Sequence, residues 1–200
     1  MLPAKAILYK CPHCGNKKPL VNLMSGNTFG GRQWSDTKAD YPMLPKVSPV
    51  QRCPECGHYW FAHDAKTSGG EDYSMDTGKL SYKEAKEALD ELWDKSLREQ
   101  DEINLLLSFV FSYNDSFFRG EDCGTPTQED TELFDKVILA LTDLKINDTL
   151  KAELLREAER FGECIEFLHD AKPVEDFEAG VRETILKKAQ GEDSKVFELK

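Results

Sequence analysis

The sequence predicts an α+β protein, in which a small β-rich module is followed by an α-helical bundle with one repeat-like helix pair. Residues 1–64 are rich in Gly, Pro and aromatic side chains and have no long helical period. In contrast, most of residues 80–200 repeat apolar side chains at helical spacing. The charge and the cysteines are also divided unevenly between these two parts. We therefore predict a first domain at residues 1–64, a linker at 65–79 and a helical domain at 80–200.

The charge distribution separates the same two parts. The 200 residues include 26 Lys and Arg and 37 Asp and Glu, so the formal net charge is −11. Residues 1–64 hold eight basic and four acidic residues and carry +4, which leaves −15 for the rest. Acidic surfaces bind nucleic acid poorly, because attraction to phosphate comes from clustered Lys and Arg. This objection applies to the helices and only weakly to residues 1–64.

Targeting signals are not evident in the sequence. The N-terminus lacks the layout of a signal peptide, and no apolar run reaches the length of a membrane span. We therefore expect a cytoplasmic protein with no membrane partner.

Four cysteines in the first part form two near-identical motifs of the type Cys-Pro-x-Cys-Gly. The cysteines are Cys11, Cys14, Cys53 and Cys56. Two residues between the cysteines of a pair allow one tight turn to direct both sulfurs at a single ion, and the following Gly readily adopts a positive φ. Four thiolates complete the tetrahedral coordination of Zn²⁺ and leave no position for water. We therefore predict a structural Zn²⁺ site with these four ligands, and strands in the β-prone flanks at 7–9 and 58–61.

Other uses of the four thiols fit the sequence less well. A redox dithiol is expected beside a βαβ pattern, which does not surround either motif. Disulfides are rare in cytosolic proteins. An iron–sulfur cluster is compatible with four cysteines, but the spacing does not single it out. The paired motifs resemble the knuckles of a zinc ribbon, and this resemblance implies a small β-rich fold held together by the metal.

The long segment between the two motifs contains a candidate surface for a ligand or a partner. Asn27, Arg32, Trp34 and Asp36 lie in the loop 25–38 and combine polar groups, charges and a flat aromatic ring. Such a combination on a loop is typical of a binding surface, and an enzyme active site in this loop is a minor alternative. In the other interpretation, which we favour, the glycines form turns and the aromatic side chains cover a small core.

Capping signals and apolar periodicity locate the helices of the second part. A capping box after an apolar residue predicts a helix that begins near Ser81, and an apolar run predicts a buried helix over 103–113. Further helices are expected near Gln128, after Asn147 and over 174–190.

Residues 151–171 resemble one helix pair of the tetratricopeptide type. The turn of the pair lies at 160–162, and the small side chains of Ala152 and Cys164 occupy positions where two helices approach closely. No second copy at the repeat period is evident, so we predict a bundle with one such pair rather than a stacked solenoid. Cys164 is then a small core residue, whereas Cys123 lies in a polar loop and has no assigned role.

Together, the long-loop ribbon, the loop sequence SGNTFGGRQWSD, the sequence SYNDS at 112–116 and the repeat-like pair resemble an uncharacterised bacterial protein family. The resemblance implies no particular activity.

Two hypotheses for function follow from the residues. The leading one is a non-enzymatic adaptor that binds another protein, because the Cys₄ site is closed and no paired catalytic residues are evident. The alternative is an accessory factor in transcription or RNA processing that contacts nucleic acid through residues 1–64. In that case the aromatic rings of Trp34, Tyr59, Trp60 and Phe61 would stack on bases.

Overall fold

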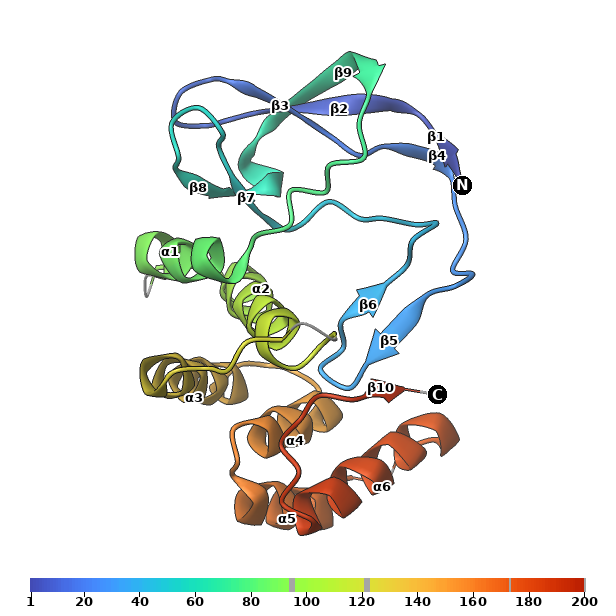
Figure 1. Cartoon of the computed structure of the whole chain (residues 1–200), viewed down its shortest axis with the longest axis vertical. Coiled ribbons are helices and arrows are strands. Elements are labelled where there is room, and N and C mark those ends of the chain that lie inside the picture. The colour runs from blue at the N-terminus through green and yellow to red at the C-terminus, as the bar shows by residue number, and fades with distance from the viewer. Residues whose placement is uncertain (94–95, 121–122, 173, 200) are drawn as a thin grey trace. The chain divides into compact units, whose positions relative to one another are not determined.

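The computed structural model describes residues 1–93, 96–120, 123–172 and 174–199. The elements group into two compact units, and each is described by itself (Figure 1). Unit 1 consists of Met1–Arg32 and Asp40–Ser112, and unit 2 consists of Gln33–Ala39 and Tyr113–Lys200. Small sheets in the N-terminal half are followed by helices, which confirms the predicted α+β class. The predicted domain boundaries stay a prediction, because a grouping by contacts does not show which parts fold independently.

The described strands form small sheets with the orders β1-β4, β3-β2-β9, β7-β8 and β10-β5-β6. The strands are β1 (Leu2–Pro3), β2 (Lys5–Lys10), β3 (Lys17–Leu20), β4 (Leu23–Ser25), β5 (Arg32–Trp34), β6 (Ala39–Asp40), β7 (Val50–Arg52), β8 (Tyr59–Phe61), β9 (Lys66–Tyr73) and β10 (Glu198–Leu199). The α-helices are α1 (Tyr82–Leu92), α2 (Glu99–Phe117), α3 (Gln128–Asp143), α4 (Asp148–Glu157), α5 (Phe161–Asp170) and α6 (Asp176–Gln190).

Two antiparallel hairpins of unit 1 carry the cysteine motifs at their tips. In the first hairpin, Lys10 of β2 pairs with Lys17 of β3, and the first motif connects these two residues. In the second hairpin, Arg52 of β7 pairs with Tyr59 of β8 around the second motif. The strands expected in the β-prone flanks of the motifs are therefore present.

Strand β9 occupies residues that the sequence assigned to a linker. It pairs antiparallel with β2 and forms an edge of that sheet. Its sequence, KTSGGEDY, is polar and almost entirely exposed, so hydrophobic alternation did not mark it as a strand. At Gly70 a Cβ atom would lie 2.9 Å from the carbonyl oxygen of Ala6. The close approach of β9 to β2 therefore depends on a glycine at this position.

Helix α1 packs on β8 in unit 1. It begins after Ser81, as predicted, and Ser81 and Glu84 form the reciprocal hydrogen bonds of a capping box. The first part of α2 belongs to the same unit, and there the ring of Phe109 lies 5.6 Å from that of Tyr82 on α1.

The helix starts of the second half follow their capping residues. Thr127 caps α3 through a capping box with Asp130, and the side chain of Asn147 accepts a hydrogen bond from the N–H of Leu150 at the start of α4. Helix α2 extends beyond the predicted range of 103–113 at both ends. The first turn of α2 is acidic, and acidic side chains stabilise the N-terminal end of a helix. Apolar periodicity did not reveal this turn, because it lacks regularly spaced apolar residues.

Helices α4, α5 and α6 of unit 2 enclose a small apolar core. Its buried side chains are Ala152, Leu155, Cys164, Ile185 and Ala189. The prediction that Cys164 is a core residue is confirmed, because its side chain is fully buried. Helices α4 and α5 form the predicted pair, while the relationship of this pair to tetratricopeptide repeats stays a prediction.

None of the helices in the described ranges combines the length and the apolar character that crossing a membrane would require.

Candidate metal centre

The two cysteine motifs fold into the same turn. The N–H of Gly15 donates to the carbonyl oxygen of Cys11 at 2.9 Å, and the N–H of Gly57 donates to that of Cys53 at 3.0 Å. In each motif the N–H of the first cysteine also bonds to the carbonyl oxygen five positions later. Both glycines have a φ of 78°, a conformation that glycine adopts without steric cost. The repeated sequence thus produces a repeated local structure.

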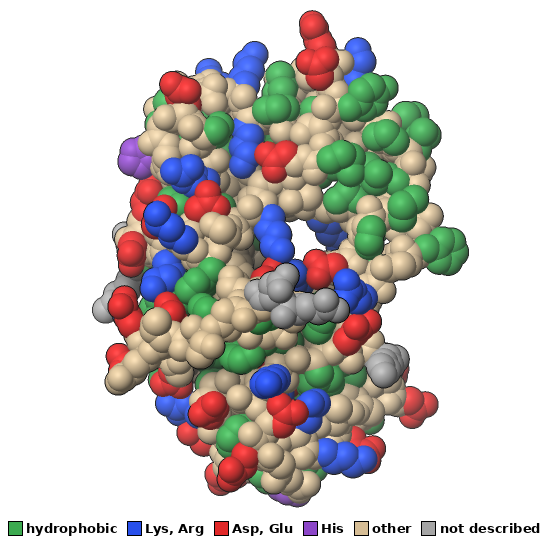
Figure 2. Space-filling model, in the orientation of Figure 1, with side chains coloured by type: hydrophobic (Ala, Val, Ile, Leu, Met, Phe, Trp, Pro, Cys, Tyr) green, Lys and Arg blue, Asp and Glu red, His purple; other side chains and the backbone are tan. Residues whose placement is uncertain are grey.

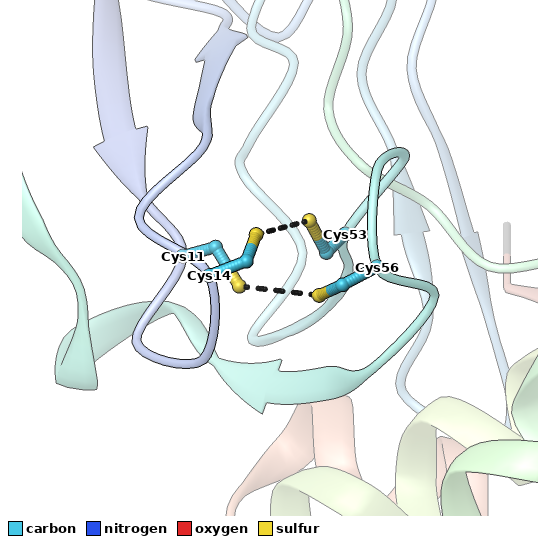
Figure 3. A group of neighbouring side chains, drawn as sticks. All are labelled: Cys11, Cys14, Cys53 and Cys56. Carbon is cyan, nitrogen blue, oxygen red and sulfur yellow. Dashed lines mark hydrogen bonds between the residues drawn. The ribbon is translucent and has the colours of Figure 1, made fainter.

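The four sulfurs of these turns face one another (Figure 3). The Sγ atoms of Cys14 and Cys53 are 3.6 Å apart, those of Cys11 and Cys56 are 3.8 Å apart, and all four lie within 4.8 Å of one another. A tetrahedral Zn²⁺ with Zn–S bonds of about 2.3 Å separates its sulfurs by about 3.8 Å. A disulfide would need about 2.05 Å. The four predicted ligands therefore form a possible site for one metal ion.

The thiols of Cys53 and Cys56 have opposite pKa shifts. Burial raises the pKa of Cys53, but hydrogen bonds from the backbone N–H groups of Cys56 and Glu55 and from the Cys56 thiol outweigh it and lower this pKa to about 6. At Cys56 a backbone hydrogen bond from His58 lowers the pKa, yet burial and the neighbouring thiols raise it to about 12. A metal ion would displace the protons of these thiols, because it binds cysteine as the thiolate.

One side of the cluster is enclosed and the other is open to solvent. Cys11 and Cys53 are buried against the ring of Trp60, whereas Cys14 is exposed. The imidazole rings of His13 and His58, one from each motif, stack with their centroids 4.6 Å apart. A chelator in solution can therefore reach the cluster from its open side.

Polar contacts tie the second motif to α1 and the first hairpin to the second. The Nδ1 atom of His58 lies 2.8 Å from the carboxylate of Glu91, and the hydroxyl of Tyr59 donates to Glu87 at 2.7 Å. The ammonium group of Lys18 on β3 donates to the side chain of Gln51 on β7 at 3.0 Å. These contacts fix the two hairpins, and hence the two pairs of sulfurs, within unit 1.

The candidate residues of the loop 25–38 fall into both units. Asn27 and Arg32 belong to unit 1 and are exposed, and the side chain of Asn27 accepts a hydrogen bond from the N–H of Phe29 in a turn. Trp34 and Asp36 belong to unit 2, where Trp34 is half-buried and Asp36 is fully buried. A binding surface shared by the four residues stays a prediction, while Asp36 contacts other side chains instead of solvent.

Asp36 is the centre of a buried polar network in unit 2. Its carboxylate accepts hydrogen bonds from Asn114 at 3.0 Å and from the guanidinium of Arg119. Asn114 also donates to Glu157 at 2.8 Å, and Arg119 donates to Asp115 at 2.8 Å. The guanidinium of Arg119 lies 5.2 Å from the centre of the Trp34 ring. The network therefore holds the segment 33–39 to α2 and α4.

Burial shifts the pKa values of two members of this network. Burial and the nearby carboxylate of Glu153 raise the pKa of Glu157 well above its usual range, while the hydrogen bond from Asn114 and the charge of Arg156 oppose this shift. Burial lowers the pKa of Arg119 to about 10, and Glu157 opposes this shift. Arg119 therefore keeps its charge at neutral pH and can neutralise Asp36.

Sequence reasoning missed Asn114, Arg119 and Glu157 as partners of Asp36. Asn114 and Arg119 lie 78 and 83 residues further along the chain, so no local spacing connects them to Asp36. The one usable signal was the pair of polar residues Asn114 and Asp115 at the end of an otherwise apolar helix pattern.

The remaining cysteines, Cys123 and Cys164, belong to unit 2. Cys123 is half-buried, and its thiol donates to the carbonyl oxygen of Gly120 at 3.4 Å. Burial raises the pKa of the Cys164 thiol to about 11, so this thiol stays protonated and unreactive.

Comparison of the chain with known protein families, with curated proteins and with solved structures finds no match. The fold and the site by themselves define an α+β protein with a four-cysteine candidate metal centre at the tips of two hairpins.

Proposed function

We propose that this chain is a zinc-stabilised protein-interaction module without catalytic activity. Two Cys-x-x-Cys turns with sulfur separations of 3.6 and 3.8 Å support this proposal, because four thiolates around one tetrahedral ion are a usual arrangement of structural zinc sites. Four thiolates fill the coordination sphere, so the ion would hold the hairpins together and would not activate water. Several metal atoms with bridging sulfides would need more space between the cysteines than this cluster offers.

The observation that supports an interaction role is a set of exposed apolar side chains on unit 1, Leu2, Met24, Tyr73 and Met75, which we call the apolar patch. Met24 is 73% exposed and Tyr73 is 66% exposed. Strand β1 pairs with β4, and Tyr73 at the end of β9 pairs with Lys5, two residues after β1. Figure 2 shows hydrophobic side chains gathered over β1 and β4.

A patch of this kind indicates contact with another protein. Single exposed apolar side chains are common, but a contiguous group of large ones is typical of an interaction surface. Methionine side chains also adapt to varied partners. We expect the partner to be a protein that offers an apolar segment to this patch.

The nucleic-acid alternative has less support from the positions of the aromatic rings. Tyr59, Trp60 and Phe61 lie in β8 and are buried, so they cannot stack on bases without unfolding the hairpin. One neighbour of the half-buried Trp34 is already the Arg119 guanidinium. The alternative then depends on the +4 charge of residues 1–64 alone.

Quantitative capture from extracts of the source organism tests the interaction proposal. The full chain with Met24→Ser and Tyr73→Ser should lose at least one specific partner that the unchanged chain retains. Leu139→Ser is the matched control, because Leu139 is an exposed apolar residue of unit 2. Both variants should keep the circular dichroism spectrum of the unchanged protein, since the replaced side chains face solvent. Equal capture by the patch variant and the unchanged protein would contradict the proposal.

A further inference from the structure

Unit 2 contains a cavity of about 400 Å³, whereas the cysteine cluster belongs to unit 1. Its walls come from β5 and the turn after it, from β10 and from the first turns of α4 and α6. The apolar lining includes Trp34, Leu150 and Val181, and the polar lining includes Thr149 and Glu178. Such a volume, with a lining divided about equally between apolar and polar side chains, suits a small amphipathic ligand or a single long side chain.

Two aromatic rings line this cavity. Trp34 is half-buried and already lies 5.2 Å from the guanidinium of Arg119, so its ring interacts with a cation within the fold. Phe177, in the first turn of α6, is 65% exposed. An exposed ring of this size at the edge of a cavity provides an aromatic face for a ligand.

Carboxylates outnumber cations around the cavity, where Arg182 donates to Thr149 at 2.7 Å and lies 3.4 Å from Glu178. Glu178 is the charged residue in the described lining, and Glu175 and Asp176 line an adjoining hollow together with Phe177 and Glu178. Lys and Arg are absent from the described residues that line the cavity. Over the sequence of unit 2, 23 acidic residues stand against 13 basic ones, so this unit carries −10 of the net charge.

The acidic residues at the start of α6 stabilise the helix, and they also contribute negative charge to the cavity. Carboxylates in the first turn of α6 stabilise the helix through its dipole. Glu178 accepts a hydrogen bond from Thr149 and lies 3.4 Å from Arg182, so its carboxylate is held in place at the cavity wall. A fixed carboxylate beside aromatic rings is an arrangement that selects positive charge.

We propose that this cavity binds an organic cation, an ammonium or guanidinium group carried on a short apolar body. The aromatic rings of Trp34 and Phe177 would contact the cation and its apolar part, and Glu178 would supply the counter-charge. The source of the cation is either a free amine or a basic side chain of another protein, since both present the same chemistry. This proposal concerns unit 2 and does not depend on the apolar patch of unit 1.

Calorimetric titration of the full chain tests the proposal with matched ligands. The cations are choline and N-acetyl-arginine amide, and the neutral control is 3,3-dimethyl-1-butanol, which has the shape of choline without its charge. We expect at least one cation to bind about fivefold or more tightly than the neutral analogue, and its binding to weaken as salt is added. Preference for choline identifies a free amine as the source, and preference for the arginine derivative identifies a protein side chain.

Variants of exposed residues then locate the site. Glu178→Gln keeps the acceptor for Thr149 but removes the charge, and Phe177→Leu removes the ring, so each should weaken cation binding by about fivefold. Glu183→Gln is the matched control on the same helix, because Glu183 pairs with Lys187 in solvent and does not line the cavity. The proposal is overturned if neither cation binds at concentrations up to about 10 mM, if the neutral analogue binds equally well, or if Glu178→Gln binds as the unchanged protein does.

Discussion

Replacing Asp36 with asparagine should lower the free energy of unfolding of unit 2 by about 3 kcal/mol. The Asp36 side chain is 0% exposed and the Arg119 side chain with which it pairs is 4% exposed. Removing one partner of a buried ion pair costs about 3–5 kcal/mol, because the other charge stays buried without compensation. Arg119 keeps Asp115 as a second partner at 2.8 Å, which places the expected loss at the lower end of that range.

Urea unfolding followed by circular dichroism of the helices measures this loss. Asp143→Asn is the matched control, because Asp143 is exposed at the end of α3 in the same unit, and its replacement should change stability by less than about 0.5 kcal/mol. The double variant Asp36→Asn with Arg119→Met should recover part of the loss, since it leaves no unpaired buried charge. If Asp36→Asn unfolds at the same urea concentration as the unchanged protein, the buried network does not stabilise unit 2.

Three further changes test other parts of the structure. The pKa of Glu157 is raised on folding, so the contribution of Glu157 to stability falls as pH rises above the pKa of an unfolded glutamate. The unfolding temperature of Glu157→Gln should therefore equal that of the unchanged protein near about pH 4 and exceed it near about pH 8. Identical pH profiles would show that Glu157 does not ionise differently in the fold. Gly57→Ala should lower the unfolding temperature of the metal-loaded protein by an amount equivalent to about 1–2 kcal/mol, because alanine is strained at a φ of 78°; an unchanged temperature would contradict the knuckle conformation. Ser81→Ala removes the capping box of α1 and should destabilise this helix by about 1 kcal/mol, as measured by hydrogen exchange of its amides. Unaltered exchange would mean that the cap does not stabilise α1.

Features with local causes could be predicted from the sequence. The two Cys-Pro-x-Cys-Gly motifs predicted two turns and a common site, since the glycine conformation and the sulfur spacing are set within five residues. Ser81, Thr127 and Asn147 marked helix starts correctly, because a cap bonds to residues only three positions away.

Features with distant causes could not be predicted in the same way. Asp36 and Trp34 were expected on one loop with Asn27 and Arg32, but Asp36 is buried because its hydrogen-bond partners, Asn114 and Arg119, lie at the end of α2 and just after it. Burial of a carboxylate depends on a cation being brought to it by the fold, and sequence spacing does not reveal that cation. Strand β9 was missed for a related reason, since its pairing with β2 depends on backbone approach rather than on apolar side chains.

We propose that the four-cysteine cluster holds one structural Zn²⁺. Native mass spectrometry with elemental analysis, on protein purified from its source organism, measures metal identity and stoichiometry together. We expect one zinc per chain in the unchanged protein and in Cys123→Ser, and none in Cys53→Ser. Structural zinc sites contribute about 10–16 kcal/mol of binding free energy, so the Cys53→Ser hairpins should also lose their structure. A folded, metal-free unchanged protein, or one that carries iron in place of zinc, would contradict the claim.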